Sequence, residues 1–239
     1  MYVLGIESAT PVAAVAVAGR EGILAERMVL NKRTHSVNLL PMIKAALEDA
    51  EIERRDLTGI AVSSGPGSFT GLRIGMSTAK ALAQVWELPV AGISTLETLA
   101  HAFAGHNRLI CPVLNARKNE VYTAVYDYSG MAPVLLMSPR AARIEELIKL
   151  LAGYQKPVTF LGDGLPVYGD QLKTGLAQMA VFAPLAASYP RGAAVAELGL
   201  VAFDNGRGVS PSRLQPEYIR LSEAEVIWRK KHCAGGLEL

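Results

Sequence analysis

The apolar positions of the first hundred residues form short strand-like runs that alternate with longer stretches of helical spacing. Runs rich in Val, Ala and Ile that are bounded by turn residues are typical of β-strands, whereas apolar residues that recur every three or four positions predict helices. The predicted elements are strands at 2–7, 12–18 and 23–30, a helix at 35–50, a strand at 59–63, a helix at 70–86, a strand at 89–93 and a helix at 94–104.

The same order of elements starts again near residue 109. The second set consists of strands at 109–114, 120–126 and 134–137, a helix at about 143–152, and a strand at 158–161 that ends in Gly162-Asp163-Gly164. The first three strands begin near residues 2, 12 and 23 in one half and near 109, 120 and 133 in the other, so their spacing is similar. A repeated element order without residue identity indicates an ancient duplication.

We therefore expect an α/β protein with two tandem domains, each built on a mixed sheet flanked by helices. The predicted boundaries are residues 1–105 for the N-terminal domain, 106–232 for the C-terminal domain and 233–239 for a disordered tail. A strand at 215–220 and a helix at 223–231 are expected near the end of the second domain. A single doubly wound sheet is the alternative.

Composition excludes several classes of protein. Half of the 239 residues are apolar and 19% are charged, which rules out disorder as the main state. The longest uncharged run, 174–190, is interrupted by Gln178 and Pro184 and does not resemble a membrane span, and Glu7 within the first apolar run argues against a secretory leader. Two cysteines cannot form a disulfide framework, so a cytoplasmic location is expected. A net charge of +2 does not by itself indicate nucleic-acid binding.

The most distinctive segment is a glycine-rich run from Ser63 to Gly75, between a predicted strand and a predicted helix. Glycines allow close backbone approach, and free N–H groups at a helix start suit an anion. The glycine spacing is one residue longer than the dinucleotide fingerprint, no Gly-Lys-Ser/Thr follows, and Ser68 lacks the second glycine of a nucleophile elbow. A structural turn and a phosphate cradle both remain open for this loop, whose residues are Gly65, Pro66, Gly67, Ser68, Phe69, Thr70, Gly71 and Arg73.

Polar residues at the tip of the first predicted hairpin are a second candidate for ligand binding. Glu7, Ser8 and Thr10 place a carboxylate and two hydroxyls at a strand end, where they could hold a phosphate or a hydrated magnesium ion. A solvated hairpin turn explains them equally well. The corresponding tip of the second half has no carboxylate before Glu120, although a phosphoryl-transfer enzyme would need a group there.

The histidines form no metal-binding pair by spacing. His101 and His106 are five residues apart, not the four that would place both rings on one helical face, and Leu39 stands four positions after His35. No Ser/His/Asp set can be singled out. We therefore expect neither a metal site nor a catalytic residue on this chain.

Two predicted helices, at 35–50 and 70–86, carry more apolar surface than one sheet can cover. A helix on a sheet buries a stripe about 100° wide, and both helices have apolar residues beyond that stripe. Such a surplus is typical of contact with another element or chain. We predict a partner or dimer interface, with coverage by the second domain as the alternative, made by Leu39, Met42, Ala46, Leu72, Ile74, Met76, Ala79 and Ala83.

Several runs, in one order along the chain, resemble the bacterial TsaB (YeaZ) family. The most specific extends from Ser64 to Gly75 and reads Gly-Pro-Gly-Ser-Phe-Thr-Gly-Leu-Arg at its centre. The other matching runs are Glu7-Ser8-Ala9-Thr10, His35-Ser36, Leu40-Pro41-Met42-Ile43, Asn115-Ala116-Arg117, Glu120-Val121-Tyr122 and Gln215-Pro216-Glu217-Tyr218-Ile219-Arg220.

The resemblance implies a fold, a function and partners. The fold would be two actin/sugar-kinase/Hsp70-like (RNase H-like) domains, in agreement with the duplication. The function would be that of a non-catalytic scaffold subunit in the synthesis of threonylcarbamoyladenosine at position 37 of tRNA, which is the substrate of the complex, with no role for a membrane. The chain would form a homodimer when alone and would bind a TsaD-like catalytic paralogue through its N-terminal helices, together with a TsaE-like ATPase. ATP and metal would bind to those partners, and no cofactor is expected on this chain alone.

Two departures from the family pattern bear on nucleotide binding. Glu7 stands where the family commonly has Asp, and Asn115 replaces the Asp of the family's Asp-Ala-Arg run. Both departures argue against magnesium-nucleotide binding by this chain. The residues that could still make weak nucleotide or phosphate contacts are Glu7, Ser8, Thr10, Gly162 and Gly164. A free-standing ATPase or small-molecule kinase that uses those residues is nevertheless the alternative function. A metallopeptidase is less favoured because paired ligands are missing.

Basic residues gather near the C-terminus. They are Arg220, Arg229, Lys230 and Lys231. The cluster is either a solvated tail or a contact for tRNA.

Overall fold

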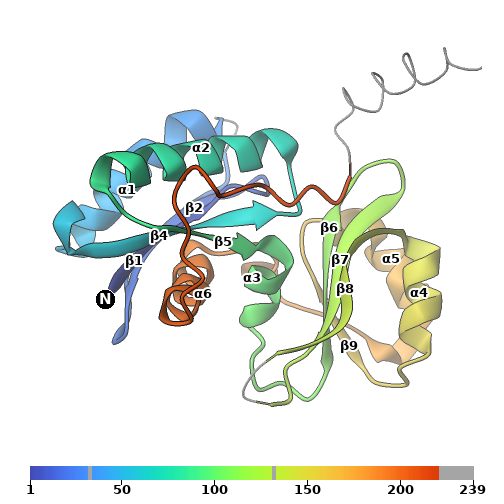
Figure 1. The fold of residues 1–239 in the computed structure, drawn as a ribbon. Helices are drawn as coiled ribbons and strands as arrows, with labels where there is room; N and C mark the ends of the chain where they lie inside the picture. Colours follow the sequence, from blue (N-terminus) through green and yellow to red (C-terminus); the bar gives the residue numbers. More distant parts are fainter. Residues whose placement is uncertain (32–33, 131–132, 221–239) are drawn as a thin grey trace, which may run out of the picture.

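The computed structural model describes residues 1–31, 34–130 and 133–220 (Figure 1). The first half contains one five-stranded mixed sheet, in which three antiparallel strands are followed by two strands parallel to the first. In the order in which they lie across the sheet, the strands are β3 (Gly22–Val29), β2 (Ala13–Gly19), β1 (Tyr2–Glu7), β4 (Leu57–Gly65) and β5 (Val90–Ser94). The β1–β2 register pairs Tyr2 with Gly19 and Glu7 with Ala14.

The second half repeats this sheet strand for strand. Across the sheet the strands are β10 (Ala180–Phe182), β9 (Val158–Leu161), β6 (Leu109–Asn115), β7 (Glu120–Asp127) and β8 (Val134–Arg143). Each strand has the same parallel or antiparallel neighbours as its counterpart in the first half. The predicted pair of mixed sheets is therefore confirmed, and the single doubly wound sheet is wrong.

Two helices cover the outer face of each sheet (Figure 1). On the first sheet, α1 (His35–Asp49) and α2 (Phe69–Trp86) lie side by side, and on the second sheet α4 (Ile144–Ala152) and α5 (Leu165–Leu176) take the same places. Short 3₁₀ turns occur at Arg54–Asp56, Ala177–Met179 and Leu185–Ala187.

The other two helices cross between the halves. α3 (Thr95–His101) ends the first half in sequence, yet its Leu96 packs against the second sheet, on the face opposite α4 and α5. α6 (Gly192–Asp204) ends the second half, yet its Val195 packs against the first sheet, on the face opposite α1 and α2. The halves are therefore held together by a reciprocal exchange of helices.

Coverage on both faces explains why β2 contains no polar side chain. Every residue of β2 is buried. Val15 and Val17 join the core under α1 and α2, whereas Ala16 and Ala18 face α6 on the other side of the sheet. The alternation of larger and smaller side chains fits the two layers, because alanines leave room for α6 to approach the strands closely.

Several details of the sequence prediction need correction. Residues 215–220 form no strand; the chain there passes from the first half to the second, and the Glu217 N–H donates to Ser64 O. The helix predicted at 94–104 is shorter, and α5, β10 and α6 had no predicted counterpart. The helix predicted at 223–231, the basic residues at 229–231 and the tail at 233–239 lie outside the described residues.

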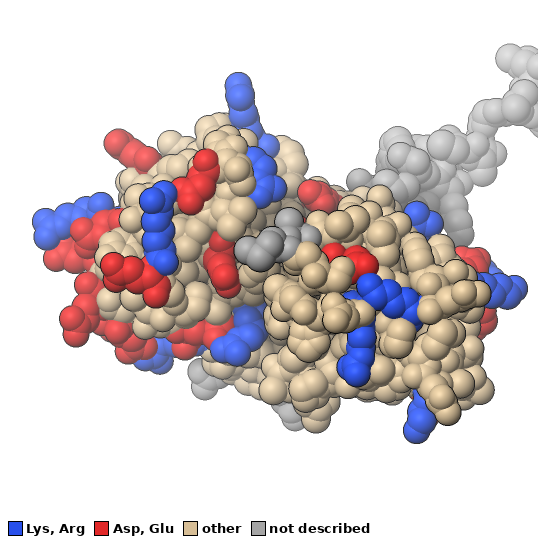
Figure 2. Space-filling model, turned by 90° about the horizontal axis from the view of Figure 1, so that it is seen from below, with Lys and Arg blue, Asp and Glu red and all other residues tan. Residues whose placement is uncertain are grey.

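The surface of the described residues is mixed in charge. In the view of Figure 2, acidic and basic side chains are interspersed over the first half and no extended area carries one sign, in line with a net charge of only +2. Within the described ranges, no helix combines the length and the apolar character needed to cross a bilayer.

Candidate functional site

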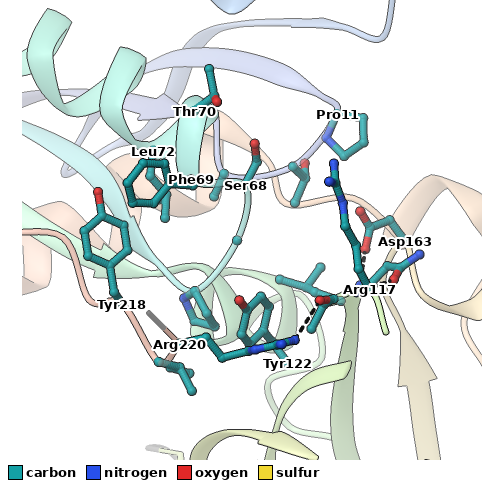
Figure 3. Close-up of a pocket in the computed structure, with 18 of the residues that line it drawn as sticks. Pro11, Ser68, Phe69, Thr70, Leu72, Arg117, Tyr122, Asp163, Tyr218 and Arg220 are labelled. Atoms are coloured by element: carbon teal, nitrogen blue, oxygen red, sulfur yellow. Dashed lines mark hydrogen bonds between the residues drawn. The ribbon is translucent and has the colours of Figure 1, made fainter. Parts of the chain in front are cut away.

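A cavity of about 650 Å³ opens between the two halves, where the central strands of both sheets end (Figure 3). One wall consists of the β1–β2 turn, the glycine-rich loop and the first residues of α1 and α2. The other wall consists of the β6–β7 turn, Asp163 and the chain at 217–220. The lining residues are Ala9, Thr10, Pro11, His35, Pro66, Gly67, Ser68, Phe69, Thr70, Leu72, Leu114, Asn115, Ala116, Arg117, Lys118, Tyr122, Asp163, Glu217, Tyr218, Ile219 and Arg220.

Glu7 is fully buried behind this cavity and does not line it. Its carboxylate accepts a hydrogen bond from the backbone N–H of Ala9 at 2.6 Å and another from the hydroxyl of Ser63. Burial disfavours the charged carboxylate and raises the pKa of Glu7 from 4.5 to about 7, although the hydrogen bonds oppose this shift. A direct contact of Glu7 with magnesium or phosphate is not supported, because both carboxylate oxygens have partners inside the protein.

The other two polar residues of the first turn differ in position. Ser8 is also fully buried, and its hydroxyl donates to the carbonyl oxygen of Gly71 at 2.9 Å. Thr10 lines the cavity, but only 2% of its surface is exposed, and its hydroxyl accepts a hydrogen bond from the Val12 N–H at 3.3 Å. Of the residues predicted at this turn, only Thr10 borders the space that a ligand could enter.

The glycine-rich loop packs directly against the β1–β2 turn. A Cβ atom on Gly67 would lie 2.3 Å from the carbonyl oxygen of Ala9, and one on Gly71 would lie 2.1 Å from that of Ser8. The N–H of Ser68 donates to Ala9 O at 2.7 Å, and the N–H of Gly71 donates at 3.2 Å to the Ser68 hydroxyl, which caps α2. Donors at these two positions are therefore used within the protein, which favours the structural turn over the phosphate cradle.

Gly162 and Gly164 serve the close approach of β9 to β6. A Cβ atom on Gly162 would lie 2.3 Å from the carbonyl oxygen of Val113, and one on Gly164 would lie 2.9 Å from the same atom. Neither glycine lines the cavity, whereas Asp163 between them does. One Asp163 oxygen accepts from the Asn115 N–H at 2.9 Å, and burial raises the pKa of this carboxyl above its ordinary value.

The β6–β7 turn contributes an unusual backbone conformation. Arg117, Lys118 and Asn119 have φ values of 62°, 53° and 61°, in the left-handed region that residues other than glycine seldom adopt. The side-chain oxygen of Asn115 accepts from the Arg117 N–H at 2.9 Å and supports this turn. As a result, the Arg117 side chain extends across the cavity toward Pro11 (Figure 3).

Polar side chains in the cavity wall are mostly engaged with their own surroundings. Arg220 lies 2.8 Å from the Glu120 carboxylate and donates to Ala116 O at 3.0 Å. His35 Nε2 lies 2.9 Å from Thr10 O. Burial raises the pKa of Tyr122, and the positive charge of the nearby Arg220 opposes this rise. Among the described lining residues, no hydroxyl is paired with a general base, so the cavity offers polar and aromatic contacts for a small ligand but no activated nucleophile.

Nothing in the sequence alone marks Arg117, Tyr122, Asp163 and Tyr218 as residues of one site. Arg117 and Tyr122 belong to family-like runs and Asp163 to a Gly-Asp-Gly turn, so their segments were visible in the sequence. Their convergence depends on the packing of the two halves, which no local pattern specifies.

The side chains predicted to face a partner lie instead in the core of this chain. Seven of the eight are at most 7% exposed and Ile74 is partly buried, so the structure contradicts their assignment to an intermolecular surface; they are Leu39, Met42, Ala46, Leu72, Ile74, Met76, Ala79 and Ala83. The physical reason is that α1 and α2 contact each other as well as the sheet, so each helix buries two stripes. The large apolar side chains exposed on these helices are Val37, Leu40 and Val85, at 56%, 55% and 73%.

The described histidines occupy separate places. His101 of α3 lies 3.2 Å from Glu197 of α6, His106 packs edge-on against Phe103, and His35 lines the cavity. Within residues 1–31, 34–130 and 133–220, no three His, Cys, Asp or Glu side chains are grouped in a way that could hold a metal ion.

Comparisons with known proteins extend over nearly the whole chain. Residues 22–228 match the TsaD family model, described as tRNA N6-adenosine threonylcarbamoyltransferase. The tRNA threonylcarbamoyladenosine biosynthesis protein TsaB of Bacillus subtilis is 30% identical over 95% of this chain and 98% of its own length, and TsaB of Escherichia coli is 29% identical over 96% and 98%. A solved protein described by its similarity to the peptidase YeaZ from Pseudomonas aeruginosa superposes with a TM-score of 0.79 at 25% identity, over 92% of this chain and 99% of that one. The chain therefore belongs to the TsaB (YeaZ) family.

Proposed function

We propose that this chain acts in the synthesis of threonylcarbamoyladenosine in tRNA, as a non-catalytic subunit that binds and supports a TsaD-like catalytic subunit. The observation that carries this proposal is the similarity to Bacillus subtilis TsaB, which covers 95% of this chain and 98% of the relative. A match of that extent includes both sheets, the cavity between them and the helices on their outer faces. The similarity is therefore to the whole relative and not to one of its halves.

The matching family model is described as a transferase, so a catalytic role for this chain has to be weighed. Glu7, the carboxylate nearest the turn where an actin-like enzyme would act, is enclosed by protein and bonded to Ala9 and Ser63. Ser68 and His35, a serine and a histidine in the cavity wall, each bond within their own wall. These contacts favour a supporting role, with ATP and metal bound by the TsaD-like subunit and a TsaE-like ATPase.

The outward face of α1 and α2 is the surface that we assign to the partner. Val37 and Leu40 expose more than half of their surface on α1, and Val85 does so on α2. Exposed large aliphatic side chains on neighbouring helices are suited to burial against another protein. In the absence of the TsaD-like subunit, a second copy of this chain would cover the same face, and tRNA would bind to the complete assembly.

Reconstitution with purified components tests this function. We expect threonylcarbamoyladenosine to form when tRNA, threonylcarbamoyl-adenylate, a TsaD-like subunit, a TsaE-like ATPase and this chain are combined, and to fall at least tenfold when this chain is omitted. The purified chain alone should show no magnesium-dependent ATP turnover above that of its Glu7→Ala variant. Full modification without the chain would contradict the supporting role. ATP turnover that Glu7→Ala abolishes would favour the ATPase or kinase alternative.

A further inference from the structure

The last described segment of the chain crosses from the first half of the protein to the second. In Figure 1 it passes from α6 over the first sheet and reaches the top of β6 and β7. Leu214, at one end of this segment, is 6% exposed and belongs to the core of the first half. Arg220, at the other end, contacts the second half. We call residues 214–220 the C-terminal strap.

The backbone of the strap is fixed to the end of β4 and the start of the glycine-rich loop. The N–H of Glu217 donates to the carbonyl oxygen of Ser64 at 2.7 Å. Gly65 has a φ of 121°, and a Cβ atom there would lie 2.7 Å from the carbonyl oxygen of Glu217. The first glycine of the loop is therefore required for contact with the strap, not with the cavity.

Two further residues of the glycine-rich loop hold the side chain of Tyr218. The rings of Phe69 and Tyr218 have centroids 4.9 Å apart at an interplanar angle of 31°. The guanidinium carbon of Arg73 lies 3.9 Å from the centre of the Phe69 ring, and Arg73 Nε donates to the Tyr218 hydroxyl at 3.2 Å. The three side chains form one cluster, in which Arg73 contacts the Phe69 ring and the Tyr218 hydroxyl.

The far end of the strap is fixed to the β6–β7 turn. The Arg220 guanidinium pairs with Glu120 at 2.8 Å and donates to Ala116 O at 3.0 Å. Figure 3 shows Arg220 beside the cavity, with a dashed line for its hydrogen bond to the β6–β7 turn. Both partners belong to the second half, whereas every contact of Leu214, Glu217 and Tyr218 described above is with the first. Residues 217–220 also form part of the cavity wall.

We propose that the glycine-rich loop is the binding site for the C-terminal strap, and that the strap limits the opening of the two halves around the cavity. Gly65, Phe69 and Arg73 position one end of the strap, and Glu120 with Ala116 positions the other. The inference goes beyond the proposed function and does not depend on it, because it concerns contacts within a single chain. It gives a physical role to the loop whose glycine spacing fits no nucleotide-binding motif.

Hydrogen exchange tests the first attachment. In Arg73→Met, the Glu217 amide should exchange about tenfold faster than in the wild type, the effect expected from losing a cation–π contact and one hydrogen bond. Arg27→Met is the matched control, since Arg27 also pairs on the surface of the first half, with Asp49, but does not contact the strap. An unchanged Glu217 exchange rate in Arg73→Met would overturn the role of the loop as the strap's binding site.

Distances between spin labels on the two halves test the second part of the proposal. Labels replace Lys44 on α1 and Lys149 on α4, in a Cys233→Ser background in which Cys111 remains buried. Tyr218→Ala and Arg220→Met, which release opposite ends of the strap, should each broaden the distance distribution. The double variant should broaden it no further, because a strap released at one end no longer limits opening. Distributions identical to the wild type in both single variants would show that α3 and α6 alone hold the halves, and would overturn the proposal.

Discussion

Met76→Arg is expected to destabilise the isolated chain strongly, whereas Leu40→Arg is expected to preserve the fold and prevent binding of the catalytic subunit. Met76 is 4% exposed in the core beneath α2, and an unpaired charge there costs about 3–5 kcal/mol, a large part of the stability of a typical domain. Leu40 is 55% exposed on α1, so its replacement leaves the guanidinium in water until a partner covers it.

Two measurements separate these effects. In denaturant unfolding, Met76→Arg should have a lower free energy of unfolding than the wild type, and Leu40→Arg should not. In gel filtration with the TsaD-like subunit, Leu40→Arg should fail to form the complex. Val201→Arg is the matched control, because Val201 is 47% exposed on α6, away from α1 and α2. A complex that forms normally with Leu40→Arg would exclude this part of the outward face from the interface. If Met76→Arg were as stable as the wild type, the placement of Met76 in the core would be wrong.

Glu7→Gln is expected to stabilise the protein above neutral pH and to have little effect near pH 4.5. The pKa of Glu7 is raised from 4.5 to about 7, so the folded protein retains a proton that the unfolded chain loses in this range. The contribution of Glu7 to the free energy of unfolding is therefore fully present below pH 4.5 and is lost as the pH rises to about 7. At about 1.4 kcal/mol per pKa unit, the loss amounts to about 3 kcal/mol. Glutamine keeps a neutral side chain of the same shape and does not titrate.

The free energy of unfolding should therefore be measured for the wild type and Glu7→Gln at several pH values from 4.5 to 8. The difference between them should grow by about 3 kcal/mol in favour of the variant. Glu21→Gln, at an exposed turn, serves as the control, and its difference from the wild type should be nearly constant. A pH-independent difference for Glu7→Gln would mean that the Glu7 carboxyl is not a buried group that holds its proton.

Much of the architecture was predictable because it depends on local patterns. Strand length, turn residues and the spacing of the first three strands in each half are all present in the sequence, and they identify the duplication. The crossing of α3 and α6 was not predictable, because the apolar residues of a helix do not specify which sheet will cover them. Val195 therefore packs on a sheet whose strands ended about a hundred residues earlier.

The error at α1 and α2 has a definite physical origin. Apolar residues around more than one stripe indicate more than one neighbour, but the pattern does not tell a neighbour in the same chain from one in another chain. Here α1 and α2 are each other's neighbours, and small residues such as Ala46, Ala79 and Ala83 are fully buried. The exposed residues Val37, Leu40 and Val85 were part of the same apolar pattern and could not be separated from the core without the structure.

The cavity was predictable as a region but not as a set of residues. Glu7 and Ser8, at the end of the first strand, were candidates for either a ligand site or a solvated turn, yet the glycine-rich loop covers them. Tyr218 and Arg220 were assigned to a strand, although their side chains reach opposite halves of the protein. Those contacts link positions more than a hundred residues apart, which no periodicity in the sequence reveals.

The most direct test of the central claim is the nucleoside composition of tRNA from cells depleted of this chain. Mass spectrometry should show threonylcarbamoyladenosine reduced to background, with recovery when the wild type or Val201→Arg is expressed and no recovery with Leu40→Arg. Fully modified tRNA in cells that lack the chain would contradict the account.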